Sequence, residues 1–133
     1  MSTPLLEKVR RLKQKGWRRR HPRYRADFPL KATALRDDGY AEIEGRCSDI
    51  GPGGIGTVLN GKLPPGEVVS LELHLLSSLN SLPVRAIVRY QKGFVHGLEF
   101  LGLSDEQQMA INTFCTGLEP SDEENPSAPG SAR

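Results

Sequence analysis

The sequence has no apolar run long enough to cross a bilayer, and it has few aromatic residues. A membrane-spanning helix needs roughly 18 consecutive apolar residues, which this 133-residue chain does not contain. The N-terminus also lacks an apolar stretch followed by a small-residue cleavage site. These absences predict a cytoplasmic protein. Aromatic residues make up only 6% of the chain, which leaves few rings for stacking on nucleic-acid bases.

Cysteine and histidine are scarce as well. Cys47 and Cys115 are far apart in the sequence and lack metal-ligand spacing, so we expect buried free thiols, with a disulfide as the alternative. Histidine occurs at three scattered positions without cysteine or carboxylate partners at ligand spacing, so no metal site is expected. The histidines are His21, His74 and His96. Ser48 lacks the strand-turn-helix context of a nucleophile, so we expect neither an enzyme nor a cofactor.

Positive charge is concentrated near the N-terminus. Ten of the 18 basic residues fall between Lys8 and Arg25, whereas the segment from Asp27 to Leu118 has seven basic and eleven acidic residues and is net negative. A polyanion would therefore not bind over the whole surface. Any anionic ligand should meet the N-terminal segment.

Helical and irregular segments flank the centre of the chain. Residues 1–16 are predicted to form a basic amphipathic helix over Pro4–Lys15, with Gly16 as its stop. Pro22 bars a regular helix through Arg18–Ala26, which we interpret as an extended linker. Residues 119–133 are rich in Ser, Pro and Glu and should be disordered.

Between the flanks, short β-type runs alternate with turn residues. This pattern predicts an all-β fold, a six-stranded antiparallel barrel, within a domain covering residues 17–118. The clearest strand is Glu67–Leu76, where apolar and polar residues alternate. A glycine-rich loop from Asp49 to Gly54 is expected after the second strand. The other predicted strands are Phe28–Arg36, Tyr40–Ser48, Ile55–Asn60, Leu82–Tyr90 and Phe94–Leu101, the last two closed around Gln91-Lys92-Gly93.

A C-terminal helix should cap one end of this barrel. Ser104 is the predicted N-cap, with Gln107 reaching back in a capping box. An apolar stripe follows and ends near Gly117. It consists of Ala110, Ile111, Phe114, Cys115 and Leu118.

Two motifs carry the functional signal. In the linker, Arg19-Arg20-His21-Pro22-Arg23 presents several guanidinium groups, which grip phosphate or the O6 and N7 edge of guanine in two-pronged fashion. Downstream, Asp49-Ile50-Gly51-Pro52-Gly53-Gly54 places glycines beside a carboxylate, so that the backbone can turn tightly and approach a ligand closely. Trp17 and Tyr24 flank the arginines and are interpreted as packing residues, with base stacking as the alternative.

The order of these motifs resembles the PilZ domain family. Its signature is R-x-x-x-R or R-R-x-x-R before the first strand, the second form including Arg20, and D/N-x-S-x-x-G between the second and third strands. Arg19 and Arg23 match the first motif, and Asp49 and Gly54 match the second. Gly51 stands where the motif has serine.

The resemblance implies a receptor for cyclic di-GMP that acts on a downstream protein partner. Arginines would grip guanine edges and phosphate, Asp49 would accept guanine N1 and N2 hydrogens or hold an arginine in position, and the glycines would supply backbone amides and clearance. The implied ligand-binding residues are Arg19, Arg20, Arg23, Asp49, Gly51 and Gly54. Gly51 lacks the hydroxyl of the serine in the motif, and the loss of that hydrogen bond should weaken ligand binding by about tenfold to a hundredfold.

Two alternatives belong to other functional classes. The barrel would serve as a protein-interaction adaptor that binds no cyclic di-GMP, or the basic segment from Lys8 to Arg25 would be a nucleic-acid-binding arm. The acidic body and the shortage of aromatic residues argue against the second alternative.

Overall fold

The computed structural model describes residues 22–75 and 80–120. The predicted N-terminal helix, together with Arg19, Arg20 and Trp17, lies outside the described residues. The same holds for the predicted disordered tail apart from Glu119 and Pro120.

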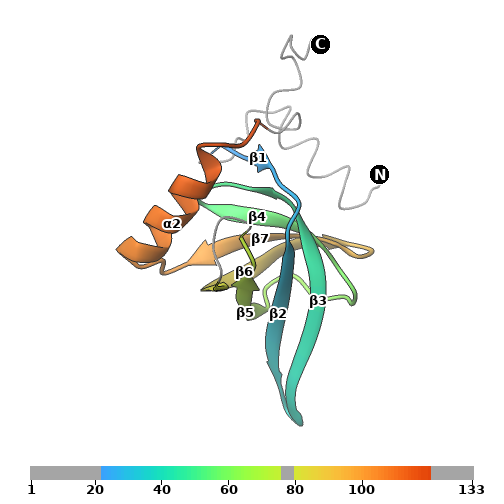
Figure 1. Ribbon diagram of the computed structural model, residues 1–133. Coiled ribbons are helices and arrows are strands. Elements are labelled where there is room, and N and C mark those ends of the chain that lie inside the picture. The colour runs from blue at the N-terminus through green and yellow to red at the C-terminus, as the bar shows by residue number, and fades with distance from the viewer. Residues whose placement is uncertain (1–21, 76–79, 121–133) are drawn as a thin grey trace.

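The described chain folds as a closed antiparallel barrel followed by one helix (Figure 1). Neighbours in the sheet follow the order β1-β3-β2-β5-β6-β7-β4, and β3 also pairs with β4, which closes the six strands β2 to β7 into a circle. This confirms the predicted six-stranded barrel. The elements are β1 (Tyr24–Arg25), β2 (Pro29–Arg36), β3 (Gly39–Ile50), β4 (Gly54–Leu59), β5 (Val68–Leu73), β6 (Leu82–Lys92), β7 (Val95–Leu101) and α2 (Asp105–Cys115).

Side-chain alternation builds the core. In β5 and just beyond it, Val69, Leu71, Leu73 and Leu75 are all buried, whereas Ser70 between them is exposed. Successive side chains of a strand point to opposite faces, so these four buried residues all point into the barrel interior. The buried core likewise contains side chains from all six strands of the barrel.

Three details of the sequence-based strand prediction are wrong. The strand predicted over Glu67–Leu76 is β5, which ends at Leu73. β3 continues to Ile50, so Asp49 lies in a strand rather than in the glycine-rich loop. The β6–β7 connection consists of Gly93 and Phe94, because Gln91 and Lys92 still pair with β7. Gly93 has φ +60°, a left-handed conformation that glycine adopts without steric cost.

Helix α2 covers one end of the barrel. Ser104 accepts a hydrogen bond from the Gln107 amide, and the Gln107 side chain accepts one from the Ser104 amide at 2.7 Å, which confirms the predicted capping box. Ile111 and Cys115 are buried in the core, and the Phe114 ring packs edge-on against Phe28 with centroids 5.4 Å apart. Among the described residues, no helix is long and apolar enough to span a membrane.

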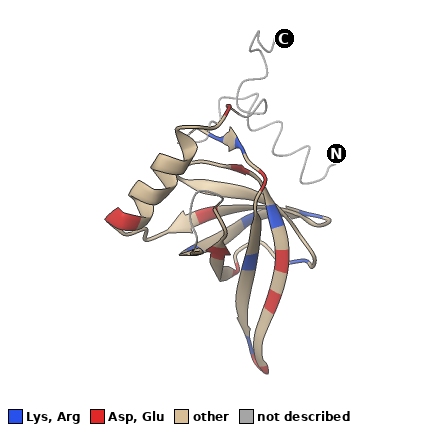
Figure 2. Cartoon of the chain, viewed as in Figure 1, with Lys and Arg blue, Asp and Glu red and all other residues tan. Residues whose placement is uncertain are grey.

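The β2–β3 hairpin projects from the barrel (Figure 1). β5 pairs with only the first half of β2, from Leu30 to Thr33. Beyond that point, Leu35 and Tyr40 face each other across the two strands and are 70% and 74% exposed. Figure 2 shows basic and acidic positions interspersed along this hairpin.

Candidate ligand-binding site

The described end of the linker lies beside the glycine turn, residues 51–53 between β3 and β4. Tyr24 pairs with Ile50 and Arg25 pairs with Asp49, so β1 extends the sheet along the last residues of β3. Tyr24 also packs against the core, as predicted. This pairing delivers Arg23, the residue immediately before β1, to the end of the barrel where the glycine turn begins.

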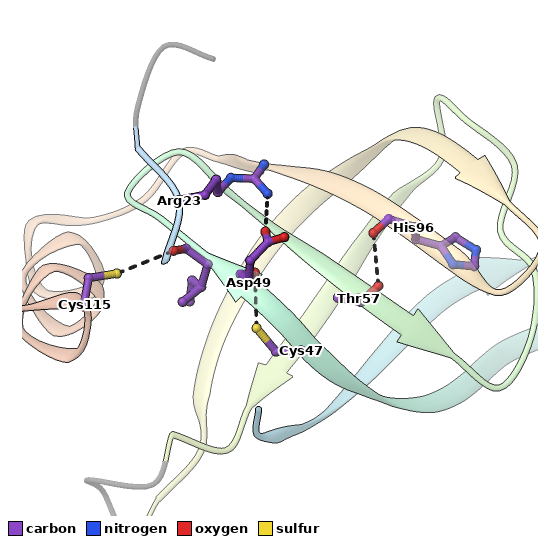
Figure 3. A network of polar contacts seen from close by, with 7 residues as sticks. Arg23, Cys47, Asp49, Thr57, His96 and Cys115 are labelled. Carbon is purple, nitrogen blue, oxygen red and sulfur yellow. Dashed lines mark hydrogen bonds and ion pairs between the residues drawn. The ribbon is translucent and has the colours of Figure 1, made fainter. Parts of the chain in front are cut away.

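Arg23 forms an ion pair with Asp49 (Figure 3). The Arg23 Nη1 to Asp49 Oδ1 distance is 2.6 Å, and the two side chains are only 13% and 14% exposed. A charge-assisted hydrogen bond of this length in a partly buried place is stronger than a surface pair. The structure therefore brings two of the predicted site residues into direct contact.

Glycines make room for this pair. A Cβ at Gly54 would lie 2.9 Å from Arg23 Nη2, and a Cβ at Gly56 would lie 2.9 Å from Asp49 Oδ1. At Gly51 a Cβ would overlap the Pro22 carbonyl oxygen and approach Arg23 Cδ to 3.3 Å. The sequence motif included Gly51 and Gly54 but missed Gly56. Its position could have been found from the spacing, because residues two apart in a strand, such as Gly54 and Gly56, lie on the same face of β4.

The amide of Gly51 is engaged within the turn. It donates to the Gly54 carbonyl oxygen at 2.9 Å, and the Phe100 amide donates to the Gly53 carbonyl oxygen at 3.0 Å. The glycine turn is thus closed on itself and tied to β7. The amide that the resemblance assigned to a ligand already has a partner.

Two exposed ion pairs lie on the strands that lead to the site. Arg89 Nε lies 2.6 Å from Glu99 Oε1, and Arg46 Nε lies 2.7 Å from Asp27 Oδ1, all with more than half of each side chain exposed. Glu99 is the β7 residue that pairs with Gly54. The Arg89–Glu99 ion pair therefore lies next to Gly54 at the edge of the site.

The two cysteines lie behind this pair as free, buried thiols, as predicted. The Cys47 thiol donates to the Asp49 carbonyl oxygen at 3.2 Å, across a register shift between Cys47 and Asp49 (Figure 3). Burial raises the pKa of Cys47 far above its usual range, and the nearby Asp49 charge raises it further. Burial also raises the pKa of Cys115 to about 11. Both groups are protonated packing residues at neutral pH.

His96 on β7 has a fully buried side chain. The Leu63 amide donates to His96 Nε2 at 2.9 Å, so Nδ1 carries the proton and donates to the Phe94 carbonyl oxygen at 2.9 Å. Burial lowers the pKa of His96. Its two ring nitrogens are occupied within the protein, which gives the residue a structural role.

Comparison with known families identifies the domain. The family model described as PilZ domain matches residues 18–117, which is more than half of the chain. No curated protein sequence matches the chain.

Solved structures share the fold. The PilZ domain of YcgR from Escherichia coli, solved with cyclic di-GMP, is 18% identical with a TM-score of 0.59, and the match covers 87% of this chain and 98% of that one. The inhibitor of motility MotI/DgrA from Bacillus subtilis is 23% identical with a TM-score of 0.58; the match covers 76% of this chain but only 50% of that one. The PilZ domain of CeSA from a cellulose-synthesizing bacterium is 18% identical with a TM-score of 0.56, over 71% of this chain and 95% of that domain. The chain belongs to the PilZ domain family.

Proposed function

We propose that the chain is a non-enzymatic receptor for cyclic di-GMP whose N-terminal segment changes conformation on ligand binding and signals to a partner protein. The observation that carries this proposal is the Arg23–Asp49 ion pair seated on the glycine turn. Family membership supports it, and so does the presence of cyclic di-GMP in the PilZ domain of YcgR.

The ligand satisfies both members of the ion pair. A guanidinium donates two parallel hydrogen bonds to phosphate or to guanine O6 and N7, and a carboxylate accepts from guanine N1–H and N2–H. Arg23 and Asp49 can therefore exchange their mutual bond for bonds to complementary parts of one molecule. After the exchange each charge still has a partner. An unpaired charge would be costly here, because both side chains are less than 15% exposed.

Neutralisation of the ligand requires more than Arg23. Cyclic di-GMP carries about two negative charges from its phosphodiesters, and Asp49 adds a third charge of the same sign. Arg19 and Arg20, four and three residues before Arg23, are the cations that the family motif supplies. Gly51 and Gly54 keep the approach free of side chains, as they do for Arg23 itself.

The signal passes through the linker. Arg23 is directly followed by β1 and preceded by the basic segment of residues 1–16, so a ligand that redirects Arg23 also redirects the chain on both sides of it. A shift in the position of that segment changes the surface that a partner protein meets. The output is a change of conformation rather than a chemical reaction.

Titration calorimetry at fixed salt tests ligand binding. We expect heat with micromolar affinity for the wild type, and affinity lower by about tenfold to a hundredfold for Arg23→Ala, as for loss of a charged hydrogen bond. Arg23→Lys keeps the charge but loses the planar fork, so its affinity should fall between the two. The double variant Arg19→Ala, Arg23→Ala should show no measurable heat.

Lys31→Ala provides the matched control. It removes one positive charge from β2, where Lys31 makes only long contacts of 3.8 and 3.9 Å to Glu42 and Glu72. Its affinity should equal that of the wild type. A wild type that gives no heat at high micromolar ligand overturns the proposal in favour of the adaptor. Equal binding of cyclic di-GMP and bulk RNA with a steep salt dependence would favour the nucleic-acid-binding arm.

A further inference from the structure

The linker crosses the glycine turn through space that any side chain at position 51 would occupy. A Cβ built on Gly51 overlaps the Pro22 carbonyl oxygen and lies 3.1 Å from the Pro22 carbonyl carbon. These are main-chain atoms, so a side chain at position 51 can be accommodated only if the linker itself moves. At Gly54 a Cβ would instead meet the Leu98 carbonyl oxygen of β7, with the end of the Arg23 side chain as its only linker contact among the nearest atoms. At Gly56 the nearest atoms belong to the Asp49 carboxylate.

Beyond this crossing, β1 is paired on both of its edges. On one edge the Ala26 amide donates to the Ser48 carbonyl oxygen of β3 at 3.2 Å. On the other edge the Arg25 amide donates to the Glu119 carbonyl oxygen at 2.8 Å, and Tyr24 forms a bridge with Pro120. The segment that follows α2 is thus hydrogen-bonded to the strand that follows Arg23.

We propose that Gly51 is a positioning residue that allows the linker to dock as β1, and that docked β1 couples Arg23 to the segment following α2. A displacement of Arg23 then loosens both the docking of β1 on β3 and its contacts with Glu119 and Pro120. The chain has a glycine where the family motif has serine because the docked path of Pro22 and a side chain at position 51 exclude each other.

The coupling follows from the geometry of a short strand. Two residues in β1 make too few hydrogen bonds to remain ordered without both neighbours, so loss of one edge weakens the other. The ligand-driven part of this inference rests on the proposed function, whereas the docking of the linker by Gly51 does not. The two parts can therefore be tested separately.

Residue-resolved amide exchange of the full chain without ligand tests the docking. In the wild type we expect protection of the Arg25 and Ala26 amides, which report on opposite edges of β1. Gly51→Ala should lower the protection of both by about tenfold or more. Gly117→Ala is the control, because a Cβ at Gly117 meets no atom within 4 Å and should change neither amide.

Three outcomes overturn the inference. Unchanged protection in Gly51→Ala shows that Gly51 does not position the linker. Loss at Ala26 with full protection at Arg25 shows that the two edges are independent. Equal loss in Gly117→Ala shows that the effect is not specific to position 51.

A second variant covers the case in which Gly51→Ala fails to fold, as judged by lost protection in β5 and β6. Arg23→Ala removes the ion pair without adding volume at the turn, and it should lower the protection of the Arg25 and Ala26 amides together by severalfold. If Arg23→Ala lowered the protection of only one of these two amides, the result would again contradict the coupling.

Addition of cyclic di-GMP to the wild type forms the last arm. We expect the protection of the Arg25 and Ala26 amides to change in the same direction and by a similar factor. Absence of binding in calorimetry would overturn the proposed function but leave the ligand-free result standing. Binding that changes one amide alone would overturn the coupling and leave the proposed function standing.

Discussion

The guanidinium of Arg23 and the carboxylate of Asp49 are joined at 2.6 Å although 26 positions separate them in the sequence. One belongs to the linker before the barrel and the other to the end of β3. Each residue is the other's partner in a place where water has little access. The pair thus fastens the linker to the barrel with the same groups that we assign to the ligand.

The pair should contribute measurably to stability. In a double-mutant cycle with Arg23→Ala and Asp49→Ala, we expect a coupling energy of about 1 to 3 kcal/mol in urea unfolding. The matched cycle at Arg89 and Glu99 has the same 2.6 Å distance, but its side chains are more than half exposed. It should give at most about 1 kcal/mol because solvent screens it. Equal couplings would show that burial does not strengthen the Arg23–Asp49 bond.

Gly56 should matter for ligand binding because it lies against the Asp49 carboxylate. Gly56→Ala would place a Cβ 2.9 to 3.0 Å from both Asp49 carboxylate oxygens and displace that side chain. We expect about tenfold weaker binding of cyclic di-GMP in calorimetry, since one charge-assisted hydrogen bond is misaligned. Gly117→Ala, with open space around its Cβ, should bind as the wild type. Unchanged affinity of Gly56→Ala would mean that Asp49 does not contact the ligand.

His96 should make the fold sensitive to acid. Burial holds the pKa of His96 below its ordinary value of 6.5, so the unfolded chain takes up a proton at a pH where the folded chain does not. The neutral His96 side chain therefore stabilises the folded state above about pH 6.5, and this stabilisation is lost as the pH falls through the folded-state pKa. Protonation of Nε2 would also oppose the donating Leu63 amide.

Urea unfolding between neutral and mildly acidic pH measures this loss. His96→Gln should be less stable at neutral pH, and its stability should fall less steeply on acidification. His74→Gln, the same substitution at an exposed position, is the control. Identical slopes for the wild type and His96→Gln would contradict the role given to His96.

Both thiols should resist modification in the folded protein. Burial raises the pKa of Cys115 to about 11 and that of Cys47 further, so almost no thiolate is present at about pH 8. We expect a thiol reagent such as dithionitrobenzoate to react slowly with the native protein and rapidly with both cysteines in denaturant. Rapid reaction of one thiol under native conditions would show that its surroundings open easily.

The sequence predicts the barrel and its capping helix well because those patterns are local. Alternating Val69, Leu71 and Leu73 mark β5, and Ser104 with Gln107 marks the start of α2. The motif order also indicated that Arg23 and Asp49 would meet. Each of these inferences depends on residues a few positions apart or on the order of segments.

Two other contacts between distant segments left no signal in the sequence. Neither the close approach of the Pro22 carbonyl group to Gly51 nor the hydrogen bond from Arg25 to Glu119 has a local signature, because each depends on how the linker crosses the end of the barrel. The register shift between Cys47 and Asp49 likewise concealed that β3 continues to Ile50. Positions of strand ends follow from tertiary pairing rather than from propensity.

The projecting β2–β3 hairpin offers a practical attachment point. Its turn at Asp37 and Asp38 is separated from Asp49 by the ten residues of β3 from Gly39 onward, which correspond to roughly 33 Å of extended strand. A fluorophore or an affinity tag inserted there would leave the glycine turn and both chain ends unmodified. Immobilisation through this hairpin would therefore allow the ligand and any partner to be added from the opposite end of the molecule.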